Sequence, residues 1–349
     1  MARVGLPTKS AKLKAARLAT ASLSRSRSTS SAAELVVVAL AAMAFRIVSA
    51  LVAAFAAALY PHAARVEREA TFGLYPVLVR FVDRSVGQWL APPLTAPVVV
   101  SWIAFACAMA VLLRVAQLDG DGERADGAVL LAAVFPFASV FGGPSAEGLF
   151  LVFALGAFYG FRTQHWIAGG LCGAVATATM PAGLLIVPAL AWIGLRDSAN
   201  RRLSVLVGLA LATAGALAYL SYLYYRGGPV GGWTASMGEW GIHFEEAPWT
   251  PLARLFISRQ SPLDTFSGVM TLIALATVPL VWWRLNGGYA IYMIAMLLLP
   301  LMSGRYETLG RSCALLFPMF VLAASIRSRA VVVLLATTCA MLYALTLGV

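Results

Sequence analysis

Long runs of apolar residues, separated by short connectors with charges, glycine or proline, extend along almost the whole chain. This pattern is typical of a helical protein that crosses a membrane several times. It predicts an all-α, polytopic membrane protein with about ten or eleven transmembrane helices. We expect these helices over residues 34–60, 95–117, 127–142, 145–161, 165–179, 181–195, 203–225, 265–284, 287–303, 311–326 and 329–348.

The overall composition agrees with this pattern. Apolar residues make up 60% of the chain, and the mean hydropathy of +0.82 is well above that of a soluble globular domain. The runs between residues 127 and 195 are shorter than the roughly 20 residues that cross a bilayer upright. We therefore expect these helices to be tilted, broken or partly re-entrant, which requires protein or a water-filled cavity around the exposed backbone.

The first 33 residues are strongly basic. They hold all three lysines and four arginines of the chain, and no acidic residue. A basic segment directly before an apolar run follows the positive-inside rule, and the remaining basic charge is dispersed, so we expect no nucleic-acid partner. The sequence predicts a disordered cytoplasmic tail at 1–33 and one transmembrane domain at 34–349. The protein is expected in the inner or plasma membrane of a bacterial cell.

A cytoplasmic N-terminus assigns the alternating connectors to two faces. Most of the short connectors predicted to be cytoplasmic carry arginine. The exterior face then receives the loops 61–94 and 226–264, the break at 142–147 and the connector 304–311. Long loops on a rigid helical scaffold often carry function. We interpret the acidic connector 119–123 as a solvated turn, because it lacks the twelve-residue ligand pattern of a calcium loop.

Glu147 is the most informative single residue. It follows a Gly-Gly-Pro break where two apolar runs meet, in the segment 135–150. An ionisable group at membrane depth is costly, so it is a functional-site hypothesis by default. The simpler alternative is that Glu147 only stabilises a helix N-terminus, where negative charge is favoured.

Other candidate residues share the predicted exterior face. A carboxylate can act as a general base on a sugar hydroxyl, and arginine recognises a phosphate bidentately. Aromatic rings lie against the apolar faces of sugars, although Trp and Tyr also occur in ordinary interface belts. Together these groups suit a substrate with a sugar, a phosphate and a hydrocarbon tail. The candidates are Glu67, Glu69, Trp233, Trp240, His243, Trp249 and Arg305.

The sequence does not indicate a metal centre. The four cysteines show no paired spacing, only three histidines are present, and no His-Glu-x-x-His motif occurs. We expect no required cofactor, and a divalent metal is not indicated.

Five segments in order, over about 70–349, resemble bacterial relatives of the PIG-V mannosyltransferases, which are GT-C enzymes with polyprenyl-phosphate sugar donors. Phe-Gly-Leu-Tyr-Pro-Val-Leu-Val-Arg at 72–80 and Gly-Pro-Ser-Ala-Glu-Gly-Leu-Phe at 143–150 are similar to two family motifs. The remaining matches are His-Trp-Ile-Ala-Gly-Gly at 165–170 with Thr-Met-Pro-Ala-Gly at 179–183, Trp240 with Pro-Trp at 248–249, and Ser-Gly-Arg-Tyr at 303–306 with Phe-Pro at 317–318.

The resemblance implies a GT-C-like fold and a role for several matching residues. Arg305 would hold the departing phosphate, with Tyr306 beside it and Arg80 as a second candidate. Tyr75 would belong to the substrate-binding set. Trp233, Trp240, His243 and Trp249 would shape the sugar or acceptor pocket.

Two departures from the family bear on catalysis. The family has a Trp-Asp pair in its first exterior loop, and its Asp serves as the base, but 60–72 contains neither residue. Met180 stands where the family has an arginine. Three interpretations follow: Glu67 or Glu69 replaces the Asp, Glu147 is the base, or the chain is a degenerate member that no longer transfers sugar.

The leading hypothesis is an integral-membrane glycosyltransferase. It would move a sugar such as mannose from a polyprenyl-phosphate donor to a lipid or glycan acceptor on the exterior face. The alternative is a catalytically degenerate PIG-V-like protein that acts as a non-enzymatic partner in envelope assembly. A transporter is the weakest of the three, because the charges cluster toward one face and the chain has no internal repeat.

Overall fold

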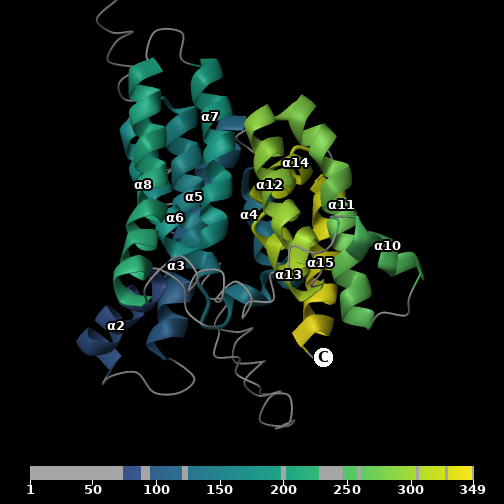
Figure 1. Cartoon of the computed structure of the whole chain (residues 1–349). Coiled ribbons are helices and arrows are strands. Elements are labelled where there is room, and N and C mark those ends of the chain that lie inside the picture. Colours follow the sequence, from purple (N-terminus) through teal and green to yellow (C-terminus); the bar gives the residue numbers. More distant parts are fainter. Residues whose placement is uncertain are drawn as a thin grey trace, which may run out of the picture.

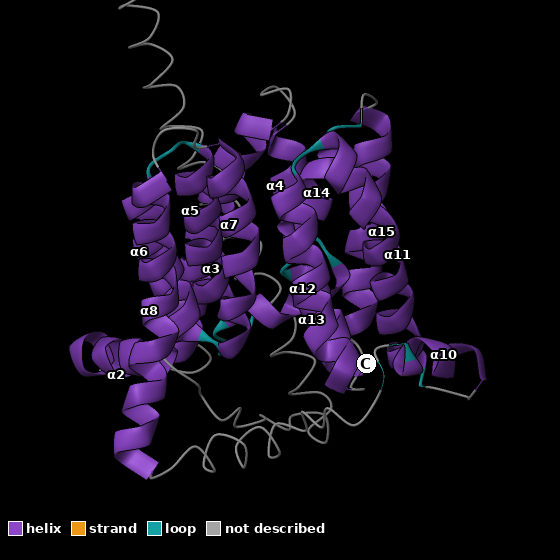
Figure 2. Ribbon diagram, turned by 45° about the horizontal axis from the view of Figure 1, so that its top comes forward, coloured by secondary structure: helices purple, strands orange, loops and turns teal. Residues whose placement is uncertain are grey.

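The computed structural model describes residues 74–87, 95–119, 125–197, 202–227, 247, 249–257, 261–303, 306–326 and 329–347. All regular elements in these ranges are helices, as Figure 2 shows, and the all-α prediction is confirmed for them. In chain order they are α2 (Leu74–Val86), α3 (Ala96–Asp119), α4 (Ala125–Ala133), η3 (Pro136–Phe141), α5 (Glu147–Arg162), α6 (Trp166–Thr179), η4 (Pro181–Leu185), α7 (Ile186–Asp197), α8 (Arg202–Gly227), α10 (Thr250–Ile257), α11 (Pro262–Arg284), α12 (Gly287–Ser303), α13 (Tyr306–Ala314), α14 (Phe317–Ala324) and α15 (Arg329–Leu347).

The helices stand side by side in two groups (Figure 1). The first group holds α3 and α5 to α8, and the second holds α4 and α11 to α15. Within the first group α6 packs on α8 and α5, and α5 packs on α3. The contacts of α3 with α4 and of α7 with α12 join the two groups.

Prolines mark irregular points in three predicted helices. The run 127–142 is divided at Pro136 into α4 and the 3-10 helix η3, and the run 311–326 is divided just before Pro318 into α13 and α14. The run 181–195 begins at Pro181 with the 3-10 helix η4, which continues directly into α7. A residue before proline is pushed out of the helical region by steric clash. Phe135 before Pro136 accordingly has ψ 139°, and Met180 before Pro181 has φ −152° and ψ 151°. Of the short runs between 127 and 195, 127–142 is broken as expected, whereas 145–161 and 165–179 form the continuous helices α5 and α6.

Two helices lie in the stretches predicted only as exterior loops. α2 lies within 61–94, and α10 lies within 226–264. Figures 1 and 2 both show α2 and α10 at the same end of the bundle, on its two opposite sides. The sequence analysis missed them because they are short, at 13 and 8 residues.

Three described helices are long and apolar enough to cross a membrane. They are α3, residues Arg202–Ser221 of α8, and α11. Shorter apolar helices accompany them, namely α6, α12 and parts of α7 and α15. The predicted first helix at 34–60 and the basic tail at 1–33 lie outside the described residues.

Candidate functional site

The break between η3 and α5 is fixed by side chains of α3. The Nε1–H of Trp102 donates to the carbonyl of Gly142 at 3.0 Å. Ser101 Oγ accepts from the backbone N–H of Ser145 at 3.0 Å and lies 2.9 Å from the carbonyl of the same residue. The hydroxyl of Ser145 turns back to the carbonyl of Val140 at 2.7 Å. The irregular backbone before Glu147 is therefore held by specific hydrogen bonds.

Tyr75 connects α2 to the same place. Its side chain is 2% exposed, and its hydroxyl donates to the carbonyl of Pro97 at 2.9 Å. The hydroxyl also lies 3.1 Å from Ser101 Oγ. We call Tyr75, Ser101, Trp102 and Ser145 the Ser101 network. The network joins α2, α3 and the start of α5 through buried hydrogen bonds.

Glu147 is the first residue of α5 and is half-buried. The preceding residue, Ala146, offers no side-chain cap to the helix, so the carboxylate of Glu147 supplies the negative charge that a helix N-terminus favours. The next residue, Gly148, packs closely on α3, since a Cβ there would lie 3.1 Å from the carbonyl oxygen of Ser101. A partly accessible carboxylate on a fixed backbone has the chemistry of a general base.

The structure brings together only some of the predicted site residues. Tyr75 and Glu147 both belong to elements that contact Ser101. Arg80 is exposed on α2, and Trp249 is 71% exposed before α10. Tyr306 begins α13, and its side chain is not described. Six predicted residues lie outside the described ranges: Glu67, Glu69, Trp233, Trp240, His243 and Arg305. The proposed roles of all these residues stay predictions.

A second polar cluster, which the sequence analysis missed, joins α3, α5 and α12. Asp119, the last residue of α3, forms an ion pair with Arg162 at the end of α5. The hydroxyl of Tyr289 donates to the other oxygen of Asp119 at 2.5 Å. The Asp119 side chain is 1% exposed. The interpretation of 119–123 as a solvated turn is therefore wrong for Asp119, because the carboxylate is buried with two partners.

The two polar clusters are far apart. Asp119 follows Ser101 by 18 positions on α3, which corresponds to about 27 Å along the helix axis at 1.5 Å per residue. The Asp119 cluster consequently lies near one end of α3 and the Ser101 network near the other. The sequence predicted α3 from its hydropathy alone. It did not predict the partners of Asp119, because Arg162 and Tyr289 are 43 and 170 positions away in the chain.

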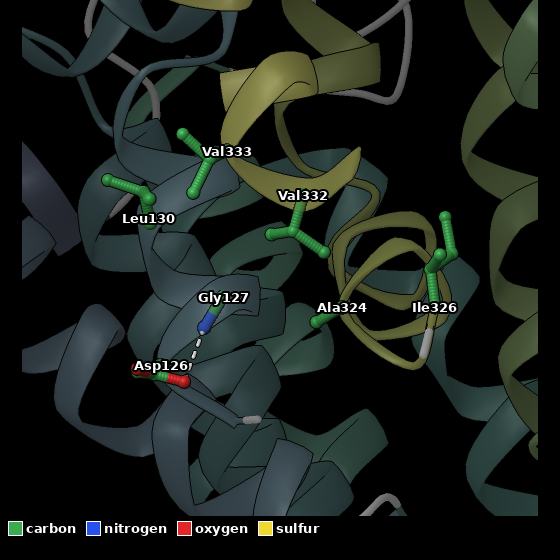
Figure 3. A pocket seen from close by; sticks show the side chains of 7 residues that line it. All are labelled: Asp126, Gly127, Leu130, Ala324, Ile326, Val332 and Val333. Carbon is green, nitrogen blue, oxygen red and sulfur yellow. Dashed lines mark hydrogen bonds between the residues drawn. The ribbon is translucent and has the colours of Figure 1, made fainter. Parts of the chain in front are cut away.

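A cavity between α4, α14 and α15 contains none of the predicted site residues (Figure 3). Its walls are mainly apolar, and the carboxylate of Asp126 accepts from the N–H of Gly127 at 3.0 Å. The lining residues are Asp126, Gly127, Leu130, Ala324, Ile326, Val332 and Val333. Asp126 is the one residue with an ionisable side chain among the seven lining residues, so the cavity lining does not combine a general acid, a general base and a nucleophile.

No cluster of three or more His, Cys, Asp or Glu side chains that could hold a metal occurs in the described ranges. The cysteines Cys107, Cys172, Cys313 and Cys339 are all free thiols. The expectation that no cofactor is required stays a prediction.

Comparison of the chain with protein-family models, with curated proteins and with solved structures finds no match. The resemblance to the PIG-V-like enzymes rests on the quoted residues and on their order along the chain. The function must consequently be argued from the site itself.

Proposed function

We propose that the chain is an integral-membrane glycosyltransferase that uses a polyprenyl-phosphate sugar donor. The observation that carries this proposal is the contact between two segments that the resemblance matches separately. Tyr75 from the 72–80 segment and Ser145 from the 143–150 segment both hydrogen bond to Ser101, next to Glu147. Residues distant in the sequence thus meet at Ser101, and one of them, Ser145, lies two positions before Glu147.

The surface of the bundle supports a membrane location. Large apolar side chains such as Leu217, Trp283 and Leu334 are exposed on the long helices. Soluble monomers rarely expose large continuous apolar patches, whereas lipid tails cover such side chains in a membrane protein. The same apolar faces offer a path for the hydrocarbon tail of the donor.

In the proposed reaction Glu147 acts as the general base. Its carboxylate takes the proton of an acceptor hydroxyl while that oxygen attacks the anomeric carbon of the sugar. The bond between the anomeric carbon and the phosphate oxygen breaks, and polyprenyl phosphate leaves. Arginine stabilises the negative charge of the departing phosphate, for which Arg305 and Arg80 are the candidates. This reaction does not demand a divalent metal.

A direct test measures sugar transfer by the purified protein in lipid nanodiscs. The donors are polyprenyl-phosphate mannose and polyprenyl-phosphate glucose, and the acceptor is a native membrane lipid extract. We expect Glu147→Gln to lower the transfer rate by about 100-fold or more, because the amide cannot accept a proton. Asp126→Asn is the matched control, since Asp126 is also an acid in the first turn of a helix but is exposed and distant from the Ser101 network.

The outcomes separate the remaining hypotheses. Full activity of Glu147→Gln would reject Glu147 as the base and direct the search to Glu67 and Glu69. Absence of transfer by folded wild-type protein would contradict the transferase proposal. That result would favour the alternative of a degenerate PIG-V-like partner in envelope assembly, which the missing Trp-Asp pair and Met180 already favour.

A further inference from the structure

We propose that Ser101 is a positioning residue whose hydroxyl fixes the backbone just before Glu147 and so directs its carboxylate. This inference rests on the proposed transferase function. Ser101 is fully buried on α3 and was not among the residues that the sequence indicated. It contacts Ser145, two residues before Glu147, and Gly148, one residue after it.

The hydrogen-bond pattern leaves Ser101 little freedom. A serine hydroxyl has one hydrogen to donate, and two carbonyls lie within reach, those of Pro97 at 3.1 Å and Ser145 at 2.9 Å. Tyr75 already donates to Pro97 at 2.9 Å. The nearer acceptor for the Ser101 hydrogen is the carbonyl of Ser145 at 2.9 Å, while the Ser101 oxygen accepts from the N–H of Ser145 at 3.0 Å. Both backbone polar groups of Ser145 are thus paired with one side chain.

Close packing fixes the other side of Glu147. A Cβ on Gly148 would lie 3.1 Å from the Ser101 carbonyl oxygen and 3.5 Å from the Phe105 backbone nitrogen. The first turn of α5 therefore lies directly against the backbone of α3. Glu147 sits between this backbone contact and the side-chain contact of Ser101 with Ser145, so the Ser101 hydroxyl fixes the backbone on the N-terminal side of Glu147.

The proposed reaction is sensitive to this direction. A general base must lie within hydrogen-bond reach of the proton that it removes. A misplacement of about 1 Å can lower the rate by about 100-fold. Loss of the Ser101 hydroxyl would release both backbone groups of Ser145 and let the start of α5 shift, while the Tyr75 hydroxyl keeps its hydrogen bond to Pro97.

The test compares Ser101→Ala with Ser267→Ala in nanodiscs. Ser267 is a matched control because it is also buried in a helix, on α11, but its hydroxyl has no hydrogen-bond partner among the described residues. We expect Ser101→Ala to lower kcat for sugar transfer at least about tenfold and to leave KM for the donor within about twofold. Ser267→Ala should change neither constant. Tyr75→Phe, which keeps the Ser101 hydroxyl, should give a smaller loss of kcat.

A second readout does not depend on activity. Hydrogen–deuterium exchange of peptides that cover 142–150 should be faster in Ser101→Ala than in wild type, and unchanged in Ser267→Ala. Wild-type kcat in folded Ser101→Ala, or unchanged exchange at 142–150, would overturn the proposal while leaving the transferase function intact. If exchange at 142–150 is faster in Ser101→Ala but the wild-type protein transfers no sugar, the catalytic role of Ser101 and the proposed transferase function are both overturned. If Ser101→Ala does not fold, Ser101→Cys takes its place, because a thiol is only a weak hydrogen-bond donor and acceptor. Wild-type kcat and wild-type exchange at 142–150 in Ser101→Cys would then overturn the proposal.

Discussion

Asp119 ends α3 with a carboxylate that is buried and accepts hydrogen bonds from two other helices. A charge is costly to bury unless it is paired and hydrogen bonded. Arg162 supplies the opposite charge, and the Tyr289 hydroxyl satisfies the second oxygen. The three groups link α3 and α5 in the first group of helices to α12 in the second.

Removal of one partner from this cluster should destabilise the fold. We expect Asp119→Ala to cost about 3 to 5 kcal/mol, because the largely buried Arg162 loses the carboxylate of its ion pair. Tyr289→Phe should cost less, about 1.5 to 3 kcal/mol, since only one hydrogen bond to a charged group is lost. Unfolding midpoints in detergent, with the exposed Asp126→Ala as control, measure both effects. An Asp119→Ala midpoint equal to that of the control would contradict this account.

At the scale of the element, close approach of helix backbones distinguishes the α6 and α8 pair. A Cβ on Gly170 would lie 2.4 Å from the carbonyl oxygen of Gly208, and one on Gly215 would lie 1.8 Å from that of Ala174. Neither distance is compatible with a side chain, so the two helices touch through glycines. Their packing therefore depends on small residues at a few fixed positions.

A single methyl group should separate these helices. We expect Gly170→Ala to destabilise the protein by about 1 to 3 kcal/mol, the usual cost of overpacking a close contact. Gly143→Ala serves as the control because a Cβ there meets no atom within 4 Å, and its effect should stay within about 0.5 kcal/mol. Thermal unfolding of the two variants distinguishes them. Equal stability of both variants would show that α6 and α8 can move apart freely.

At the scale of the whole molecule, the predicted topology makes the two ends of α3 face opposite sides of the membrane. The exterior side should hold α2, and the cytoplasmic side should hold the connector between α3 and α4. Arg80 on α2 and Asp126 at the start of α4 are both exposed, so each can be replaced by a reporter.

Cysteine labelling in intact cells tests this orientation. In a background without the four native cysteines, we expect a membrane-impermeant thiol reagent to label Arg80→Cys in spheroplasts and to label Asp126→Cys only after lysis. The physical reason is that charged reagents do not cross the hydrocarbon core. Labelling in the reverse order would invert the topology, and labelling of both residues before lysis would contradict a spanning α3.

The positions of most helices followed from the sequence because their signals are local. Apolar runs of sufficient length predict helices, and a proline biases the residue before it away from the helix. The predicted run 203–225 corresponds to α8, which extends over Arg202–Gly227. The predicted run 287–303 has the same bounds as α12. The short helices α2 and α10 carried too weak a signal, since they lie in stretches rich in polar and aromatic residues.

The sequence by itself determined the helical class and the approximate positions of most described helices, and it supplied the prediction that Glu147 is a site residue. Only the tertiary structure decided which polar groups meet. Ser101 pairs with Ser145, 44 positions away, and Tyr289 pairs with Asp119, 170 positions away. Such pairings depend on how whole helices pack, because a buried polar group must find its partner on whichever helix lies beside it. The same packing explains why Asp119, which was predicted to lie in a solvated turn, is buried and links the two groups of helices.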